Sequence, residues 1–275
     1  MTHSTPFFLP EALAQVTKLA QEAGALCLEI QSRLGEVQYK SPKDIVTEAD
    51  LASDALISSR LRNLFPDHGL RTEEAGITGA QDDRVWIVDP IDGTVNFSRG
   101  MPMWGISIAL VERGEPLLAV CYLPRIDEMY TAIRGQGAFC NGKPIRVSTT
   151  TELSRAIVSN GDFNVGPIQD IPALNARNIR IFTAQATHLQ RVKCVGSAVV
   201  EGAFTAAGRL DVYSMTMSYP WDIAGVALLV REAGGTVTMI DGSPLKIADG
   251  AQVLFSNSLL HQKYLDVVYP AKAGI

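Results

Sequence analysis

The chain contains 275 residues, of which 47% are hydrophobic and 19% charged, and its formal net charge is −5. This composition excludes a disordered chain, and the acidic balance argues against nucleic acid or an anionic membrane as a partner. Apolar stretches such as Trp104–Val111 are interrupted by charge before membrane-spanning length, and Met1–Pro10 lacks the features of a secretory signal. We therefore expect a globular protein of the cytoplasm.

Two helices are predicted near the N-terminus, over Glu11–Leu34 and Ala49–Phe65. Apolar residues recur every three or four positions in the first, and Gly35 follows it as a stop signal. Thr47 is the expected cap of the second, with Asp50 three residues further on.

From Val85 onward the apolar pattern changes to that of strands. The predicted strands of the first half are Val85–Val88, Ile106–Leu110, Leu117–Leu123 and Met129–Ile133. Asp89-Pro90 ends the first of them, and the pairs Arg113-Gly114 and Asn141-Gly142 are typical of turns between strands.

The second half repeats this mixture. Its predicted strands are Ala156–Ser159, Val192–Val195, Leu210–Tyr213, Thr236–Ile240 and Gln252–Phe255. Predicted helices cover Ala198–Ala207 and Ile223–Ala233, each followed by glycine. A weak shift in composition at Thr149–Glu152 divides the chain into halves, 1–150 and 151–275, which we expect to form one compact unit. The fold class expected is α+β, with layers of helices and mixed sheets.

The four cysteines form no Cys-x-x-Cys pair. They are Cys27, Cys121, Cys140 and Cys194. Each lies among apolar or strand-like neighbours, which indicates reduced, mostly buried thiols.

The segment Trp86–Thr94 places two carboxylates, Asp89 and Asp92, just beyond a buried strand. Ligand sites in such folds lie at strand ends, and two carboxylates around a proline turn can face one point. They would repel each other unless a cation lay between them, and Mg²⁺ prefers oxygen ligands. Gly93 and Thr94 add backbone amides suited to phosphate, and Thr94 adds a hydroxyl. The segment therefore indicates a metal and phosphate site.

Taken singly, these residues also have structural interpretations. The Asp89–Thr94 run is compatible with an ordinary turn, and Glu73 with Glu74 is compatible with a solvated acidic pair. Asp50 and Asp222 both lie where they could cap a helix. The histidines lie outside these motifs, and we interpret them as surface or structural residues: His3, His68, His188 and His261.

Several segments of the chain resemble signatures of the inositol monophosphatase family. Asp89–Phe97 is similar to the first family signature and Trp221–Gly235 to the second. Further similar segments follow the family order: Asp44–Asp50, Glu73-Glu74 and Gly135–Val147. The resemblance covers residues 40 to 256, and its motifs are specific for the superfamily but much less so for the substrate.

The resemblance implies hydrolysis of a small phosphate monoester, of the inositol monophosphate type, by a metal-activated water. It implies two or three Mg²⁺ ions and a phosphorylated metabolite as partner. The implied metal ligands are Glu73, Asp89, the carbonyl of Ile91, Asp92 and Asp222, with Asp50 near a weaker third site. Family members are Li⁺-sensitive, often dimeric, and fold as a layered α-β-α-β-α sandwich.

The same resemblance assigns catalytic and substrate-binding positions. Glu73 and Thr94 would activate the water, and the amides of Gly93 and Thr94 would hold the phosphate. The remaining predicted substrate contacts are Asp92, the backbone of Ala198, Met215 and Asp222.

Three alternatives remain open. Fructose bisphosphatase-like or histidinol-phosphate phosphatase activity would use the same motifs. A phosphatase of the haloacid-dehalogenase type needs two aspartates separated by one residue, whereas two residues separate Asp89 from Asp92. A non-catalytic binding or scaffold protein is disfavoured because the carboxylate set is intact.

Met215 departs from the family pattern. Inositol-specific members carry a glutamate seven residues before the aspartate of the second signature, and counting back from Asp222 gives Met215. A substrate hydroxyl facing Met215 would lose a charge-assisted hydrogen bond. Alternatively, Ser214, Thr216 or Ser218 supplies the contact.

Overall fold

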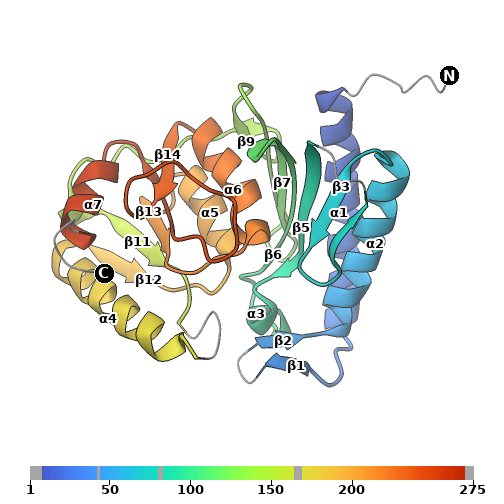
Figure 1. Cartoon of the computed structure of the whole chain (residues 1–275), viewed down its shortest axis with the longest axis horizontal. Helices are drawn as coiled ribbons and strands as arrows, with labels where there is room; N and C mark the ends of the chain where they lie inside the picture. Colours follow the sequence, from blue (N-terminus) through green and yellow to red (C-terminus); the bar gives the residue numbers. More distant parts are fainter. Residues whose placement is uncertain (1–7, 42–43, 80–82, 164–168, 270–275) are drawn as a thin grey trace.

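The computed structural model describes residues 8–41, 44–79, 83–163 and 169–269. Helices and sheets alternate in five layers, as Figure 1 shows. Two N-terminal helices cover one face of a large sheet, two central helices separate it from a smaller sheet, and two further helices cover the far face of the smaller sheet. The predicted α-β-α-β-α sandwich is confirmed.

The first layer consists of α1 (Leu9–Gln31) and α2 (Glu48–Leu64). One face of α1 packs on the large sheet with fully buried apolar residues, including Val16, Ala23 and Cys27. The helix ends earlier than predicted, because Ser32 closes its last turn and its hydroxyl donates to the carbonyl of Glu29. Gly35 is therefore not the stop.

The large sheet is mixed, with β3 and β5 parallel and the other neighbours antiparallel. In spatial order its strands are β10 (Lys143–Pro144), β9 (Ala138–Cys140), β8 (Glu128–Ile133), β7 (Glu115–Leu123), β6 (Gly105–Glu112), β5 (Arg84–Asp92), β3 (Gly69–Thr72) and β4 (Gly76–Gly79). The predicted turns Arg113-Gly114 and Asn141-Gly142 join β6 to β7 and β9 to β10.

Strand β5 extends further than predicted. It continues through Pro90 to Asp92, with a register irregularity against β6 between Asp89 and Asp92. The proline is tolerated because β3 pairs with β5 only as far as Val88, so no ladder bond to β3 is lost at Pro90. Asp89 and Asp92 thus lie on the irregular end of a central strand rather than in a loop beyond it.

The central layer consists of α5 (Ala198–Ala206) and α6 (Pro220–Glu232). Helix α6 packs mainly on the large sheet and also contacts β14, α5 contacts strands of both sheets, and the two helices contact each other. The small sheet has the order β12 (Arg191–Lys193), β11 (Ile157–Asn160), β13 (Val212–Met215), β15 (Val253–Asn257) and β14 (Gly235–Met239). The short 3-10 helix η1 (Leu153–Arg155) precedes it.

The outer layer consists of α4 (Ile171–His188) and α7 (His261–Val268), which the sequence did not predict. Two of the four buried residues of α4 are polar, Asn178 and Gln185, and both bond to neighbouring elements. A helix that buries amides shows little apolar periodicity. His261 is likewise buried and bonds to Ser256, so it is structural as expected.

Two further expectations concern the thiols and the membrane. All four cysteines are free, but only Cys27 and Cys121 are buried, and Cys194 is exposed. The prediction of mostly buried thiols is therefore wrong for Cys194, which directly follows β12, the edge strand of the small sheet. Within the described ranges, no helix combines the length and apolar composition needed to cross a bilayer.

The contact between α5 and α6 yields a stability prediction. A Cβ added at Gly202 would lie 2.4 Å from Cβ of Val226, so Gly202→Ala forces the two helices apart. We expect the free energy of unfolding in urea to fall by about 1–3 kcal/mol despite the better helix propensity of alanine.

Gly35→Ala is the control, because nothing lies within 4 Å of the added Cβ. Its effect should stay within about 0.5 kcal/mol of zero. Equal stability of the two variants would contradict the close packing.

Candidate functional site

Three carboxylates converge between the large sheet and α6. Oxygen atoms of Asp89, Asp92 and Asp222 all lie within 4.8 Å of one another. The first two come from the end of β5 and the third from the first turn of α6. Segments more than a hundred positions apart in the sequence thus form one acidic cluster, which joins both predicted signatures.

Burial and mutual repulsion raise the pKa of each member of the acidic cluster. Desolvation is the largest cause for Asp89, followed by the charges of Glu73, Asp92 and Asp222, and its pKa rises well above the ordinary value. Desolvation raises the pKa of Asp92 to about 6. The pKa of Asp222 is also raised well above its ordinary value, first by desolvation and then by the charge of Asp92. A hard divalent cation would offset both effects, and this all-oxygen donor set fits Mg²⁺.

Asp92 also closes the N-terminus of α5. Its carboxylate accepts hydrogen bonds from the hydroxyl of Ser197 and from the amides of Ala198 (3.1 Å) and Val199 (2.8 Å). Helix N-termini stabilise anions in this way. The Ala198 amide, predicted to contact substrate, therefore donates to Asp92 in this structure.

Asp222 is held by its own helix start and by an aromatic support. Its carboxylate accepts the amide of Tyr219 at 2.6 Å. Tyr219 stacks on Trp221 with ring centroids 5.1 Å apart, and Arg71 lies over the Trp221 ring at 5.4 Å. These contacts fix the first turn of α6 against β3. Asp222 is thus both the predicted cluster member and a cap.

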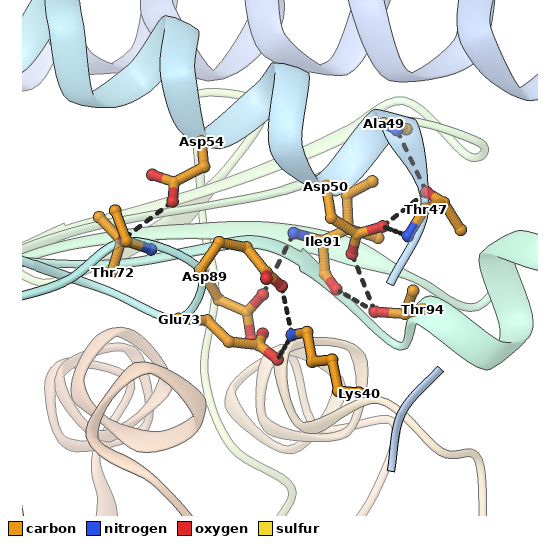
Figure 2. A network of polar contacts seen from close by, with 12 residues as sticks. Lys40, Thr47, Ala49, Asp50, Asp54, Thr72, Glu73, Asp89, Ile91 and Thr94 are labelled. Atoms are coloured by element: carbon orange, nitrogen blue, oxygen red, sulfur yellow. Dashed lines mark hydrogen bonds and ion pairs between the residues drawn. The ribbon is translucent and has the colours of Figure 1, made fainter. Parts of the chain in front are cut away.

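Thr94 has a different partner from the one predicted. Its hydroxyl lies 3.0 Å from Oδ1 of Asp50 and 3.1 Å from the carbonyl of Ile91, as Figure 2 shows. Asp50 is fully buried, and it also accepts the amide of Thr47 at 2.8 Å, completing the predicted cap of α2. Asp50 therefore combines the helix cap with the orientation of Thr94, and it stands outside the acidic cluster.

Glu73 forms an ion pair that the sequence did not reveal. Lys40 lies on β1 (Gln38–Ser41), which pairs with β2 (Asp44–Val46), and its Nζ is 3.0 Å from Oε1 of Glu73. Lys40 also contacts Oε1 of Glu74 at 2.5 Å, so Glu74 has the structural role expected. Desolvation raises the pKa of Glu73 to about 7, and Lys40 opposes the shift.

The turn that carries Glu73 is shaped by buried hydrogen bonds. Thr72, the last residue of β3, donates its hydroxyl to Asp54 of α2 at 2.9 Å and accepts the amide of Ala75 at 2.9 Å. The amide of Glu73 bonds to the carbonyl of Val88 on β5. Glu73 is thereby fixed beside Asp89, as Figure 2 shows.

Gly93 connects β5 to the short helix α3 (Thr94–Ser98) in a left-handed conformation, with φ of 87°. A Cβ there would lie 3.1 Å from the carbonyl oxygens of both Gly196 and Met103. Only glycine fits without strain at this junction between the two halves of the chain.

A pocket of about 130 Å³ opens beside the acidic cluster. Four of the residues predicted to contact substrate line it: Asp92, Ala198, Met215 and Asp222. The polar neighbours of Met215 bond elsewhere: Ser214 to Asn160, Thr216 to Asn178 and Ser218 to the carbonyl of Ala251. None of them lines this pocket, so Met215 is the residue presented at this position.

Comparisons with known proteins agree with this geometry. The model of the inositol monophosphatase family matches residues 10–272. A Thermotoga maritima protein named fructose-1,6-bisphosphatase/inositol-1-monophosphatase is 37% identical over 252 residues, or 91% of this chain and 93% of that protein. The inositol-1-monophosphatase of Synechocystis is 37% identical over 265 residues, or 94% of this chain and 90% of that protein. The solved inositol monophosphatase of Anabaena has a TM-score of 0.85 at 34% identity, covering 96% of this chain and 99% of that one.

The acidic cluster leads to a prediction about stability and metal. Asp89→Asn removes one buried charge without changing shape, so the metal-free variant should be more stable than the unaltered protein by about 1–3 kcal/mol. Mg²⁺ should stabilise only the unaltered protein, by about 2.7 kcal/mol at a hundred times its Kd.

Thermal unfolding with and without Mg²⁺ measures both effects. Asp266→Asn, which removes an exposed carboxylate from α7, should leave the Mg²⁺ response intact. An unchanged Mg²⁺ response in Asp89→Asn would show that Asp89 is no ligand.

Proposed function

Because this chain belongs to the inositol monophosphatase family, we propose that it is a metal-dependent phosphatase that hydrolyses a small phosphate monoester. The observation that best supports this proposal is the acidic cluster of Asp89, Asp92 and Asp222, which lies beside a small pocket. The cluster can hold cations for the phosphate, and the pocket can hold the leaving alcohol. The intact carboxylate set disfavours a scaffold without catalysis.

We propose Mg²⁺ as the cofactor, with two or three ions per site. One ion would be held by Asp89, Asp92 and Asp222, and a second by Glu73, Asp89 and the carbonyl of Ile91. Bound Mg²⁺ would neutralise phosphate charge and lower the pKa of the attacking water. Lys40 pairs with Oε1 of Glu73, so a cation at this carboxylate would compete with the ammonium group for its charge. Asp50 we assign to Thr94 rather than to a third ion.

The chain's own residues position the reaction. Thr94, oriented by Asp50, presents its hydroxyl oxygen to the attacking water. Glu73, on the turn after β3, accepts a proton from that water as a general base. The amides of Gly93 and Thr94 lie at a helix start suited to phosphate oxygens. No covalent nucleophile is needed, and Cys194, the exposed thiol, lies outside the acidic cluster.

The substrate within this class has two main candidates. An inositol monophosphate is favoured by relatives with that name, such as the Synechocystis enzyme. Fructose 1,6-bisphosphate is the second candidate, because the Thermotoga relative is named for both activities. Histidinol phosphate stays an open alternative.

Inhibition by Li⁺, a homodimer and a cytoplasmic location stay predictions from the family resemblance. Li⁺ should compete at the ion held by Asp92 and Asp222. Phosphate release at increasing LiCl and sedimentation of the purified chain would examine the first two.

Thr94 and Glu73 should act as a unit. Thr94→Ala and Glu73→Gln should each lower kcat by roughly a hundredfold or more, because each removes part of the water-activating arrangement. The double variant should be little worse than the poorer single variant. Thr94→Ser keeps the hydroxyl and should keep most activity, and multiplied losses in the double variant would show independent roles.

Met215 gives a prediction about specificity. Met215→Glu adds a carboxylate to the pocket, so kcat/KM for inositol 1-phosphate should rise relative to other esters by roughly tenfold to a hundredfold. A panel of phosphate esters at saturating Mg²⁺ measures the ratio. A strong preference for inositol 1-phosphate in the unaltered protein would contradict this interpretation of Met215.

A further inference from the structure

The ionisable residues that line the pocket beside the acidic cluster are all acidic. Besides Asp92 and Asp222, it is lined by the carboxyl groups of Asp162 and Glu201. Among the described residues that line it, there is no lysine, arginine or histidine. Bound cations would offset Asp92 and Asp222, but they would leave the other carboxyl groups of the pocket without a counterion.

Asp162 lines the pocket next to the acidic cluster. It lies two residues after the end of β11, and the amide of the intervening Gly161 bonds to the carbonyl of Ser214 at 2.8 Å. Its Oδ2 lies 3.0 Å from the position that a Cβ at Gly196 would occupy, so the carboxylate reaches the loop before α5. Its other oxygen accepts the thiol of Cys194 at 3.1 Å. Asp162 is exposed, so its carboxylate is open to a bound molecule.

Glu201 cannot take the same role. It is 1% exposed, and its Oε1 accepts the hydroxyl of Ser159 and the amide of Val195. Desolvation raises the pKa of Glu201 to about 8, so it is largely uncharged at neutral pH. Asp162 therefore provides the accessible negative charge of the pocket outside the acidic cluster.

Met215 lies next to Asp162 in the pocket. A Cβ at Gly161 would be 3.4 Å from Cγ of Met215, so the residue before Asp162 packs on the methionine. The position that offers no acceptor is thus adjacent to one that does.

We propose that Asp162 determines specificity by accepting hydrogen bonds from the leaving alcohol and by repelling a second anionic group. This inference rests on the phosphatase function proposed above and narrows its substrate class. The preferred substrate is the phosphate monoester of a neutral polyol or an amino alcohol. A bisphosphate or a carboxylated phosphate ester is rejected, because its second anion would meet Asp162 without a counter-charge.

Matched pairs of esters test the proposal at fixed free Mg²⁺. Glycerol 3-phosphate should exceed 3-phosphoglycerate in kcat/KM, and fructose 6-phosphate should exceed fructose 1,6-bisphosphate, each by roughly tenfold or more. Added KCl should shrink both ratios, since salt screens the repulsion at an exposed carboxylate.

Asp162→Asn and Asp162→Ser should lower kcat/KM for the neutral esters, raise it for the anionic esters and abolish the KCl dependence of the ratio. Asp83→Asn removes an exposed carboxylate that pairs with Arg113 away from the pocket, and it should leave both ratios unchanged. Unfolding midpoints equal to that of the unaltered protein will show that the variants are folded.

The two proposals fail in different ways. Hydrolysis of no ester with Mg²⁺ overturns the phosphatase function and this inference with it. Hydrolysis with equal or greater kcat/KM for the anionic esters overturns the role of Asp162 alone, and so do unchanged ratios in both Asp162 variants.

Discussion

The repulsion among three closely spaced, largely buried carboxylates is the constraint on which the rest of this molecule depends. Asp89, Asp92 and Asp222 lie within 4.8 Å of one another, and the pKa of each is raised. Such an arrangement costs folding free energy unless cations are bound. The sandwich holds it in place by burying extensive apolar surface on both faces of the large sheet. The site is thus maintained by packing, and a bound cation would offset its charge.

The fold reduces this cost by directing helix N-termini at the carboxylates. Asp92 receives the free amides at the start of α5, and Asp222 receives the amide that precedes α6. Both helices lie in the central layer and touch at Gly202 and Val226. Because the two helices pack closely, the partial positive charges at their starts keep a fixed position relative to β5. The same pair of helices therefore contributes to the hydrophobic core and stabilises the carboxylates of the site.

The sequence predicted those parts in which chemistry is local. The layered fold followed from the family resemblance, and the four central strands of the large sheet, β5 to β8, from their apolar runs. The Asp89–Thr94 run carries two cluster members because they are near neighbours on one strand. Lys40 escaped prediction because a hairpin, not local sequence, brings it to Glu73, 33 positions away. The Asp50 to Thr94 bond spans 44 positions and was hidden behind the helix cap that Asp50 also forms. Helix α4 escaped because its buried face contains amides.

Lys40 gives the metal-free site a built-in counterion. Its single ammonium group pairs with both Glu73 and Glu74 and partly offsets their charge. Under the proposed assignment of Glu73 as a ligand, metal uptake there would be an ion exchange, in which a tethered monovalent cation moves aside for a divalent one. The displaced ammonium would stay attached to the β1–β2 hairpin and so remain at high local concentration. Release of that metal would then have a competitor supplied by the chain itself.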